Sequence, residues 1–268
     1  LNYINGDYSC HLPQNYEGAI YQVFSSVEQL AAMLQSKNET ERKAKEFLKD
    51  TISDISHQLK TPLAALAMYQ EIIESEPENA ETVKQFAAKM GISLKRMEQL
   101  ILSMLKITRL DTGNIIFEKK SCRVSELIAH SVNELTARAK NENKQIQIDG
   151  GGEQKLICDM EWTGEAIGNI VKNALDHTQV GGIVRITWNR APAMFQIFIS
   201  DNGSGIAPED IHHIFKRFYR SKHSIDTQGI GLGLPLAKSI IEGQGGVISV
   251  QSESGKGTLF TLSFLTEL

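Results

Sequence analysis

The chain has 268 residues, of which 41% are hydrophobic and 22% are charged, and its formal net charge is -4. This composition is ordinary for a globular protein, and the length allows one large domain or two modest ones. The slightly acidic balance argues against a nucleic-acid partner, which selects a basic surface, and no run approaches the roughly eighteen apolar residues of a membrane helix.

The first half of the sequence reads as helix from about Glu17 to Ser75, interrupted only by Pro62. Its apolar residues follow an alternating three-four spacing: Ile52, Ile55, Leu59, Pro62, Leu66, Tyr69 and Ile73. This spacing is typical of the a/d seam of a coiled coil or an antiparallel bundle.

The acidic, proline-containing stretch from Ser75 to Asn79 predicts a turn and a new helix start. A second apolar stripe follows at Phe86, Met90, Leu94, Met97, Ile101 and Leu105. This helix should end near Asp111, with Gly113 as its C-cap. A lone hairpin leaves much of its apolar surface wet, so we expect a homodimeric four-helix bundle. The alternative is that the helices pack against the C-terminal half.

The sequence pattern changes between Asp111 and Asn114. Beyond this boundary, helix-like segments alternate with short β-like runs. The expected strands are Ile115–Phe117, Gln145–Ile148, Lys155–Cys158, Gly182–Trp188, Phe195–Ser200, Gly246–Gln251 and Thr258–Phe264. The expected helices between them are Ser125–Asn141, Met160–His177 and Leu232–Glu242. We therefore predict an α+β protein of two domains, a helical hairpin followed by an α/β sandwich.

The three cysteines, Cys10, Cys122 and Cys158, are scattered along the chain. An odd number without metal-site spacing indicates free thiols in a reducing compartment, rather than a disulfide framework or a metal site. The chain begins with Leu1 and has no signal-peptide pattern, so we expect it to be a piece of a longer protein.

His57 occupies heptad position f if Ile52 is position a, so it should face away from the bundle seam. Imidazole is largely a neutral nitrogen nucleophile at pH 7 without further activation. Pro62 removes the helical hydrogen bond of the Gln58 carbonyl, which predicts a local bend after the histidine. Taken alone, such a histidine is usually an ordinary surface residue.

The stretch from Asp54 to Leu63 resembles the H-box of two-component sensor histidine kinases. The resemblance implies that His57 accepts the γ-phosphoryl group of ATP and passes it to an aspartate of a response regulator. The family usually has an acidic residue after the histidine, whereas this chain has Gln58, which cannot take up a proton near neutral pH. We expect slower autophosphorylation at moderate pH as a result. Thr61 matches a threonine associated with dephosphorylation of the regulator, although a threonine that serves the helix bend is an equal alternative.

Glu165, Asn169 and Asn173 recur at i, i+4 and i+8, which places them on one face of a predicted helix. Carboxamide oxygens are hard ligands of the kind that Mg²⁺ prefers. The segment resembles the N-box of the same kinases and of the wider ATPase group that includes DNA gyrase and MutL. The match implies that Asn173 holds Mg²⁺. It places three further residues near the phosphates, Asn169, Lys172 and His177, and assigns Asp176 to ATP binding.

Asp201 follows a predicted strand and precedes a glycine-rich turn, where a carboxylate can accept a hydrogen bond from an adenine amino group. The turn matches the first glycine box of the family. The residues assigned to nucleotide binding here are Asp201, Gly203, Gly205 and Ile206. A plain β-turn would look similar.

Two further segments complete the pattern in the order of the family. Ile214–Arg220 resembles the F-box, with Phe215 and Phe218 packing the lid against the domain and Arg220, and less surely Arg217, near the γ-phosphate. The residues of this segment assigned to ATP binding are Phe218, Tyr219 and Arg220. A basic surface helix is the alternative. The second glycine box precedes a helix whose dipole favours anions. The residues of this box are Gly229, Gly231, Leu232, Gly233 and Leu234. Thr258, at the start of the last expected strand, completes the pattern. The polar stretch 221–228 between the boxes suggests a lid, and no P-loop motif is present.

The resemblance divides the chain into residues 1–45, a HAMP-like remnant and signalling helix, residues 46–112, the phosphotransfer hairpin, and residues 113–268, the ATP-binding domain. It implies ATP and Mg²⁺ as cofactors, a response regulator as partner, and a position on the cytoplasmic side of a membrane through upstream segments.

Two rival functions remain open. A serine kinase or an ATP-driven clamp of the same ATPase group would lack the H-box hairpin. A non-catalytic dimeric scaffold is suggested only by Gln58.

Overall fold

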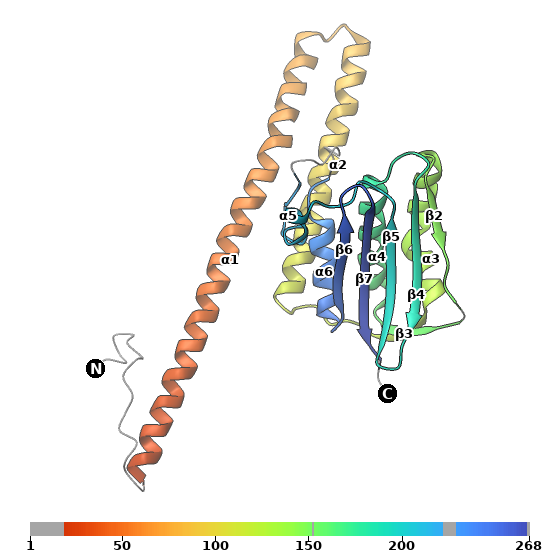
Figure 1. Cartoon of the computed structure of the whole chain (residues 1–268). Coiled ribbons are helices and arrows are strands. Elements are labelled where there is room, and N and C mark those ends of the chain that lie inside the picture. Colours follow the sequence, from red (N-terminus) through yellow and green to blue (C-terminus); the bar gives the residue numbers. More distant parts are fainter. Residues whose placement is uncertain (1–18, 152, 222–228, 267–268) are drawn as a thin grey trace. The chain divides into compact units, whose positions relative to one another are not determined.

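The computed structural model describes residues 19–151, 153–221 and 229–266, and the chain divides into two units between Ser93 and Leu94. The predicted HAMP-like segment before residue 19, the segment 222–228 of the predicted lid, and Cys10 lie outside the described residues. Each unit is described on its own (Figure 1).

The first unit is built on one long helix, α1 (Ala19–Ser75), which continues through Pro62 without a break. A turn at residues 76–79 follows, and α2 (Ala80–Asp111) begins after it. The Asn79 side chain accepts a hydrogen bond from the Thr82 N–H at 3.2 Å, so it caps the first turn of α2. The rings of Tyr69 and Phe86 lie 5.6 Å apart, which joins the two arms. The predicted helical hairpin is confirmed.

The last turns of α2 belong to the second unit, where Leu100, Met104 and Ile107 are buried. The helix ends as the sequence predicts, because Gly113 adopts a φ of 67°. Its N–H donates to the Leu110 carbonyl, and the next N–H donates to the Arg109 carbonyl, which is a Schellman C-cap.

A two-stranded antiparallel sheet follows α2, formed by β1 (Lys120–Arg123) and β3 (Lys155–Cys158). The prediction of a strand at Ile115–Phe117 is wrong, because these residues have no regular structure and the strand begins at Lys120. Apolar residues mark the earlier segment, but it is the later, polar segment that finds a pairing partner in β3.

The main sheet has five strands in the order β2-β4-β5-β7-β6. The β2–β4 pair is parallel and all other pairs are antiparallel. Its strands are β2 (Gln145–Ile148), β4 (Ile183–Arg190), β5 (Met194–Asp201), β6 (Val247–Glu253) and β7 (Gly257–Leu265).

Three helices pack together on one face of this sheet (Figure 1). They are α3 (Val124–Asn141), α4 (Met160–His177) and α6 (Gly233–Gly243). Alternate residues of β4, β5 and β7 are buried, as expected for a sheet that is covered on one face. The core includes Ile186, Phe195, Ile197, Ile199, Phe260 and Leu262. The second unit is therefore a two-layer α/β sandwich, as predicted. One short helix, α5 (Pro208–Ile211), precedes the F-box-like segment.

Candidate nucleotide-binding and phosphoacceptor sites

His57 lies on α1 with its side chain exposed, as its heptad position predicts. Its neighbour Gln58 is half-buried, and Thr61, one turn further along, is exposed. The nearby Ser56 hydroxyl donates to the Ile52 carbonyl at 2.8 Å, which satisfies that side chain within the helix. The imidazole is thus available to a reactant from solvent in this unit.

The polar stripe on α4 is present and partly buried. Its members Asn169 and Asn173 are half-buried, while Ala166, Ile170 and Ala174 beside them are fully buried. Asn169 Nδ2 donates to the Glu165 carbonyl oxygen at 3.0 Å, which leaves its Oδ1 atom facing away from the helix backbone. A polar stripe beside a packed apolar face is suited to presenting amide oxygens to a ligand.

Other predicted residues of α4 differ in their surroundings. The Lys172 side chain is exposed. The Asp176 carboxylate lies 2.5 Å from an Arg138 guanidinium nitrogen on α3, and Arg138 also binds Glu142 at 2.6 Å. The two carboxylates raise the pKa of the Arg138 guanidinium against the opposing effect of its burial. Asp176 therefore joins α4 to α3, a structural role that its spacing alone did not indicate.

Asp201 ends β5, where its Oδ1 atom accepts a hydrogen bond from the Gly203 N–H at 2.9 Å. Burial raises the pKa of this carboxyl group, and the backbone amides of Gly203 and Thr258, which stabilise the carboxylate, oppose the shift. A buried carboxylate that is only partly compensated is suited to accept a further hydrogen bond from a ligand.

The turn after Asp201 is held closely against the end of α4. A Cβ atom added to Gly203 would lie 2.3 Å from the His177 carbonyl oxygen, and the Ser204 N–H donates to that oxygen at 3.1 Å. The position therefore requires glycine for close approach. It brings the first glycine segment against His177, the last residue of α4.

The same turn is anchored on its other side by the β6–β7 hairpin. The Ile206 N–H donates to Ser252 Oγ at 2.8 Å, and this hydroxyl lies 3.0 Å from Thr258 Oγ1. Gly205, which precedes Ile206, is half-buried. Asp201 and Thr258 also pair directly in the β5–β7 ladder. Thr258 is thus next to the first glycine segment.

The F-box-like segment packs against the second glycine segment. The Phe218 N–H donates to the Gly231 carbonyl oxygen at 2.9 Å. Gly231 has a φ of 75°, and an added Cβ atom would lie 2.9 Å from the Phe218 backbone. Tyr219 donates from its hydroxyl to the Asp210 carboxylate, and Arg217 forms an ion pair with Asp111. Arg217 is therefore held by α2, whereas Arg220 is exposed.

The second glycine segment also reaches α4, at the start of α6. A Cβ atom added to Gly233 would lie 3.2 Å from Asn169 Oδ1. Leu232 is buried, Leu234 is half-buried and Gly229 is exposed. The structure thus brings the α4 asparagine, the F-box-like segment and the second glycine segment together.

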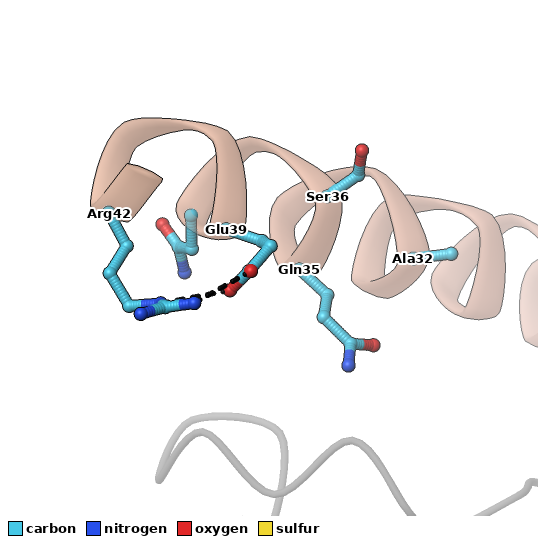
Figure 2. Close-up of a pocket in the computed structure, with 6 residues that line it drawn as sticks. Ala32, Gln35, Ser36, Glu39 and Arg42 are labelled. Carbon is cyan, nitrogen blue, oxygen red and sulfur yellow. Dashed lines mark hydrogen bonds and ion pairs between the residues drawn. The ribbon is translucent and has the colours of Figure 1, made fainter. Parts of the chain in front are cut away.

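One surface depression lies beside Asp201, and another lies along α1, away from the candidate residues. One of about 440 Å³ includes Asp201, Ser252 and Thr258 in its lining, but not the asparagines of α4. The other, of about 540 Å³, lies along α1 and is lined by Ala32, Gln35, Ser36, Asn38, Glu39 and Arg42 (Figure 2). There Arg42 pairs with Glu39 at 2.8 Å and Glu46 at 2.7 Å. Its charge is already neutralised, so this depression offers no further chemistry.

Sequence reasoning missed several side chains that shape the second unit. Lys106 lies 2.5 Å from Glu165 Oε1, and Asp111 binds Arg217. Ser252 links the first glycine segment to Thr258. No local pattern marks these residues, because each acts on a partner far away in the sequence.

The chain matches two protein families. Residues 47–113 match the family described as His Kinase A (phospho-acceptor) domain. Residues 158–268 match the family described as Histidine kinase-, DNA gyrase B-, and HSP90-like ATPase.

Individual relatives are named as a sensor-like histidine kinase and as a sensor protein. The chain is 30% identical over 217 residues to the sensor-like histidine kinase SenX3 of Mycobacterium tuberculosis. The aligned region covers 80% of this chain and 53% of that protein. It is also 30% identical over 217 residues to the sensor protein SrrB of Staphylococcus aureus, covering 80% of this chain and 37% of that protein. The chain therefore spans about half or less of the length of these curated relatives.

Solved structures share the fold. The histidine kinase ThkA in complex with the response regulator protein TrrA matches with a TM-score of 0.69, 20% identity, and coverage of 86% of this chain and 66% of that chain. The Acinetobacter baumannii histidine kinase AdeS matches with a TM-score of 0.64, 18% identity, and coverage of 78% of this chain and 97% of that chain. The two family matches and the named relatives show that the chain belongs to the sensor histidine kinases with a HisKA hairpin and a HATPase_c domain.

Proposed function

We propose that this chain binds ATP in its second unit, phosphorylates its own His57 and passes the phosphoryl group to an aspartate of a response regulator. One observation carries the nucleotide site. Phe218 and Asn169 both lie against the second glycine segment, so segments that are separate in the sequence share one location. The exposed imidazole of His57 supplies an acceptor in the same chain.

In this proposal, Asp201 accepts a hydrogen bond from the adenine amino group. The raised pKa of its carboxyl group, caused by burial, fits an acceptor that a ligand's N–H would stabilise. Gly203, Gly205 and Ile206 shape the turn beside the ring. Thr258 supports that turn through Ser252.

The phosphates would lie between α4 and the start of α6. The candidate contacts on α4 are the side chains of Asn169, Lys172 and His177, and those on the other side are the backbone groups of Gly229, Gly231 and Gly233. Amides at a helix N-terminus favour anions through the helix dipole. Arg220 would meet the γ-phosphate, where a guanidinium spreads the transition-state charge.

Asn173 fits Mg²⁺, because its half-buried amide is one turn beyond Asn169 on the same face. Magnesium, when bound, neutralises charge on the β- and γ-phosphates. Asp176 contributes to this region indirectly, since its carboxylate holds α4 to Arg138.

The chemical step would form a bond between a ring nitrogen of His57 and the γ-phosphorus, while the bond to the β–γ bridging oxygen breaks and ADP leaves. Catalysis is mainly positioning and charge neutralisation. The Gln58 amide orients the ring by a hydrogen bond, and the remaining ring proton leaves to water. Thr61 and Gln58 would orient a water for dephosphorylation of the regulator.

We further propose a homodimer formed through the hairpin. Large apolar side chains of the first unit remain exposed, at Leu48, Ile52, Leu63, Met68 and Ile92 among others. Burying them against a second copy stabilises a four-helix bundle. Light scattering of the full chain should give twice its 29.8 kDa, and a single-chain mass would contradict the dimer.

The partner and location follow from the family. The ThkA structure contains the response regulator TrrA, which supports a receiver protein as the partner of this chain. Among the described residues, no helix is long and apolar enough to cross a membrane. We propose that segments upstream of this chain place it at the cytoplasmic side of a membrane, with the domain limits 1–45, 46–112 and 113–268.

Calorimetric titration with a non-hydrolysable ATP analogue, with Mg²⁺ and then with a chelator, tests the nucleotide site. We expect the wild-type chain to bind the analogue less tightly once Mg²⁺ is chelated. Asn173→Ala should bind the analogue as weakly as chelated wild type, and the chelator should not change its affinity further. A chain that binds no analogue would instead support a non-catalytic scaffold.

A further inference from the structure

Cys122 on β1 and Cys158 on β3 lie side by side, although 36 positions separate them. Cys122 is paired with Leu156 in the β1–β3 ladder, and Cys158 is two residues further along the same strand. The two side chains are therefore diagonal neighbours on one face of the small sheet. Their Sγ atoms are 3.2 Å apart, and both thiols are free.

The two thiols differ in their surroundings. Cys158 is fully buried, whereas Cys122 is half-buried and donates to the Leu156 carbonyl oxygen at 3.3 Å. The hydrogen bond from Cys158 lowers the pKa of Cys122 to about 7. The same contact, together with burial, raises the pKa of Cys158. Cys122 is the thiol that is accessible and carries thiolate character, which is what an attacking cysteine needs.

We propose that Cys122 and Cys158 form a reversible thiol–disulfide site, in which Cys122 reacts with a hydroperoxide and Cys158 resolves the product. The geometry carries the proposal, because an accessible sulfur stands in contact with a buried one on adjacent paired strands. The two sulfurs, 3.2 Å apart, must approach by about 1 Å to form the S–S bond of about 2.05 Å.

The chemistry balances in two steps. The Cys122 thiolate attacks one oxygen of the hydroperoxide, the O–O bond breaks, and hydroxide or alkoxide leaves, so that Cys122 becomes a sulfenic acid. The Cys158 sulfur then attacks the Cys122 sulfur, its thiol proton joins the departing hydroxyl group, and water leaves. The two thiols lose two electrons, which reduce the peroxide.

The two cysteines adjoin a hydrogen-bond network at the N-terminus of α4. Asp159, which follows Cys158, caps α4 by accepting from the Trp162 N–H at 3.2 Å. It also accepts from the Glu118 N–H at 2.9 Å and donates its own N–H to Gln244 at 2.8 Å. A cross-link here therefore fixes β1 to the segment that leads into α4, the helix that carries Asn169 and Asn173.

The disulfide would close the loop from residue 122 to residue 158, which restricts the unfolded chain. We expect the melting temperature of the second unit to rise by about 5–10 °C on oxidation. Reduction should restore the original value. These readouts do not depend on kinase activity.

The test uses the full chain with Cys10→Ser, so that two cysteines remain. Protein treated with hydrogen peroxide is alkylated with N-ethylmaleimide and digested with trypsin without reduction. We expect a linked pair of the peptides Ser121–Arg123 and Leu156–Lys172, lighter than the sum of the reduced peptides by two hydrogen atoms. Dithiothreitol should abolish the link and the rise in melting temperature.

Single replacements separate the roles of the two sulfurs. Cys158→Ser should leave Cys122 to over-oxidise, with no rise in melting temperature. Because Cys158 is buried and its replacement is disruptive, Cys122→Ser serves as the second variant and should leave Cys158 reduced at the same peroxide concentration. A wild-type chain that gives only sulfinic Cys122, or only links between chains, would overturn the proposal.

Discussion

Lys106 Nζ on α2 lies 2.5 Å from Glu165 Oε1 on α4, so the last turns of α2 are tied to the helix that carries Asn169 and Asn173. Arg217 adds a second link from the F-box-like segment to Asp111, at the end of the same helix. We propose that the nucleotide domain moves about the end of α2 when it delivers the phosphoryl group to His57. These two ion pairs oppose any motion that separates α2 from α4.

Replacement of Lys106 by Met should raise the autophosphorylation rate. The Lys106 and Glu165 side chains are 43% and 28% exposed, so the pair contributes less than about 1 kcal/mol, which corresponds to at most about a fivefold rise in rate. Initial rates of labelling from ATP measure the effect. Lys120→Met is the matched control, since Lys120 forms a more exposed pair with Glu118 at 2.9 Å. A rate that falls in Lys106→Met would mean that the contact assists transfer.

Gly231→Ala should lose most ATP affinity. The residue has a φ of 75°, and an added methyl group would press on the Phe218 backbone at 2.9 Å, so the segment must move away from the phosphates. Gly245 also has a positive φ, of 83°, but a Cβ atom added there would meet nothing within 4 Å. The substitution Gly245→Ala should therefore cost only about 1–2 kcal/mol of stability, and the variant should keep its nucleotide affinity. Titration of both variants with an ATP analogue decides the point, and equal affinities would argue against a phosphate site at Gly231.

Asp201→Asn should weaken ATP binding by tenfold or more while it stabilises the ligand-free protein at neutral pH. Because burial raises the folded-state pKa of Asp201, the native state holds a proton more tightly than the unfolded chain. Stability is therefore lost as pH rises from the unfolded pKa through the folded pKa. Asparagine has no such loss, so the two melting curves should converge at low pH. If the variant melts lower than wild type at pH 7, the carboxylate is stabilising in the free protein.

Gln58→Glu should speed autophosphorylation several-fold at pH 7, because a carboxylate beside His57 can accept the ring proton while an amide cannot. Gln58 is half-buried and His57 exposed, so the exchange should not disturb the helix. The gain should shrink as pH rises, because hydroxide in the solvent can then accept the ring proton. Gln29→Glu, at an exposed position of the same helix, controls for the added charge. Equal rates in wild type and Gln58→Glu would remove Gln58 from the mechanism.

The sequence predicted the main elements well where the signal is local. The helix Met160–His177 was predicted to the residue, since Asp159 is a good N-cap and apolar residues recur at helical spacing. The turn before α2 and the C-cap at Gly113 carry equally local signatures. The strands of the five-stranded sheet were placed to within two residues.

Features that depend on distant partners could not be read in this way. β1 has the sequence Lys-Ser-Cys-Arg and becomes a strand only because β3 pairs with it. The cysteines look scattered in sequence, yet the same pairing puts two of their sulfurs in contact. The motif predicts that Asp176 binds ATP, but its partner Arg138 lies on another helix. Such contacts follow from tertiary packing, which local spacing does not encode.

The central claim is that His57 is the residue that receives phosphate. The direct measurement is incubation of the full chain with γ-labelled ATP and Mg²⁺, comparing wild type with His57→Ala and with Asn173→Ala. We predict an acid-labile, base-stable label on wild type, none on His57→Ala, and strongly reduced labelling of Asn173→Ala. An unchanged label on His57→Ala, or one that survives acid, would contradict the account.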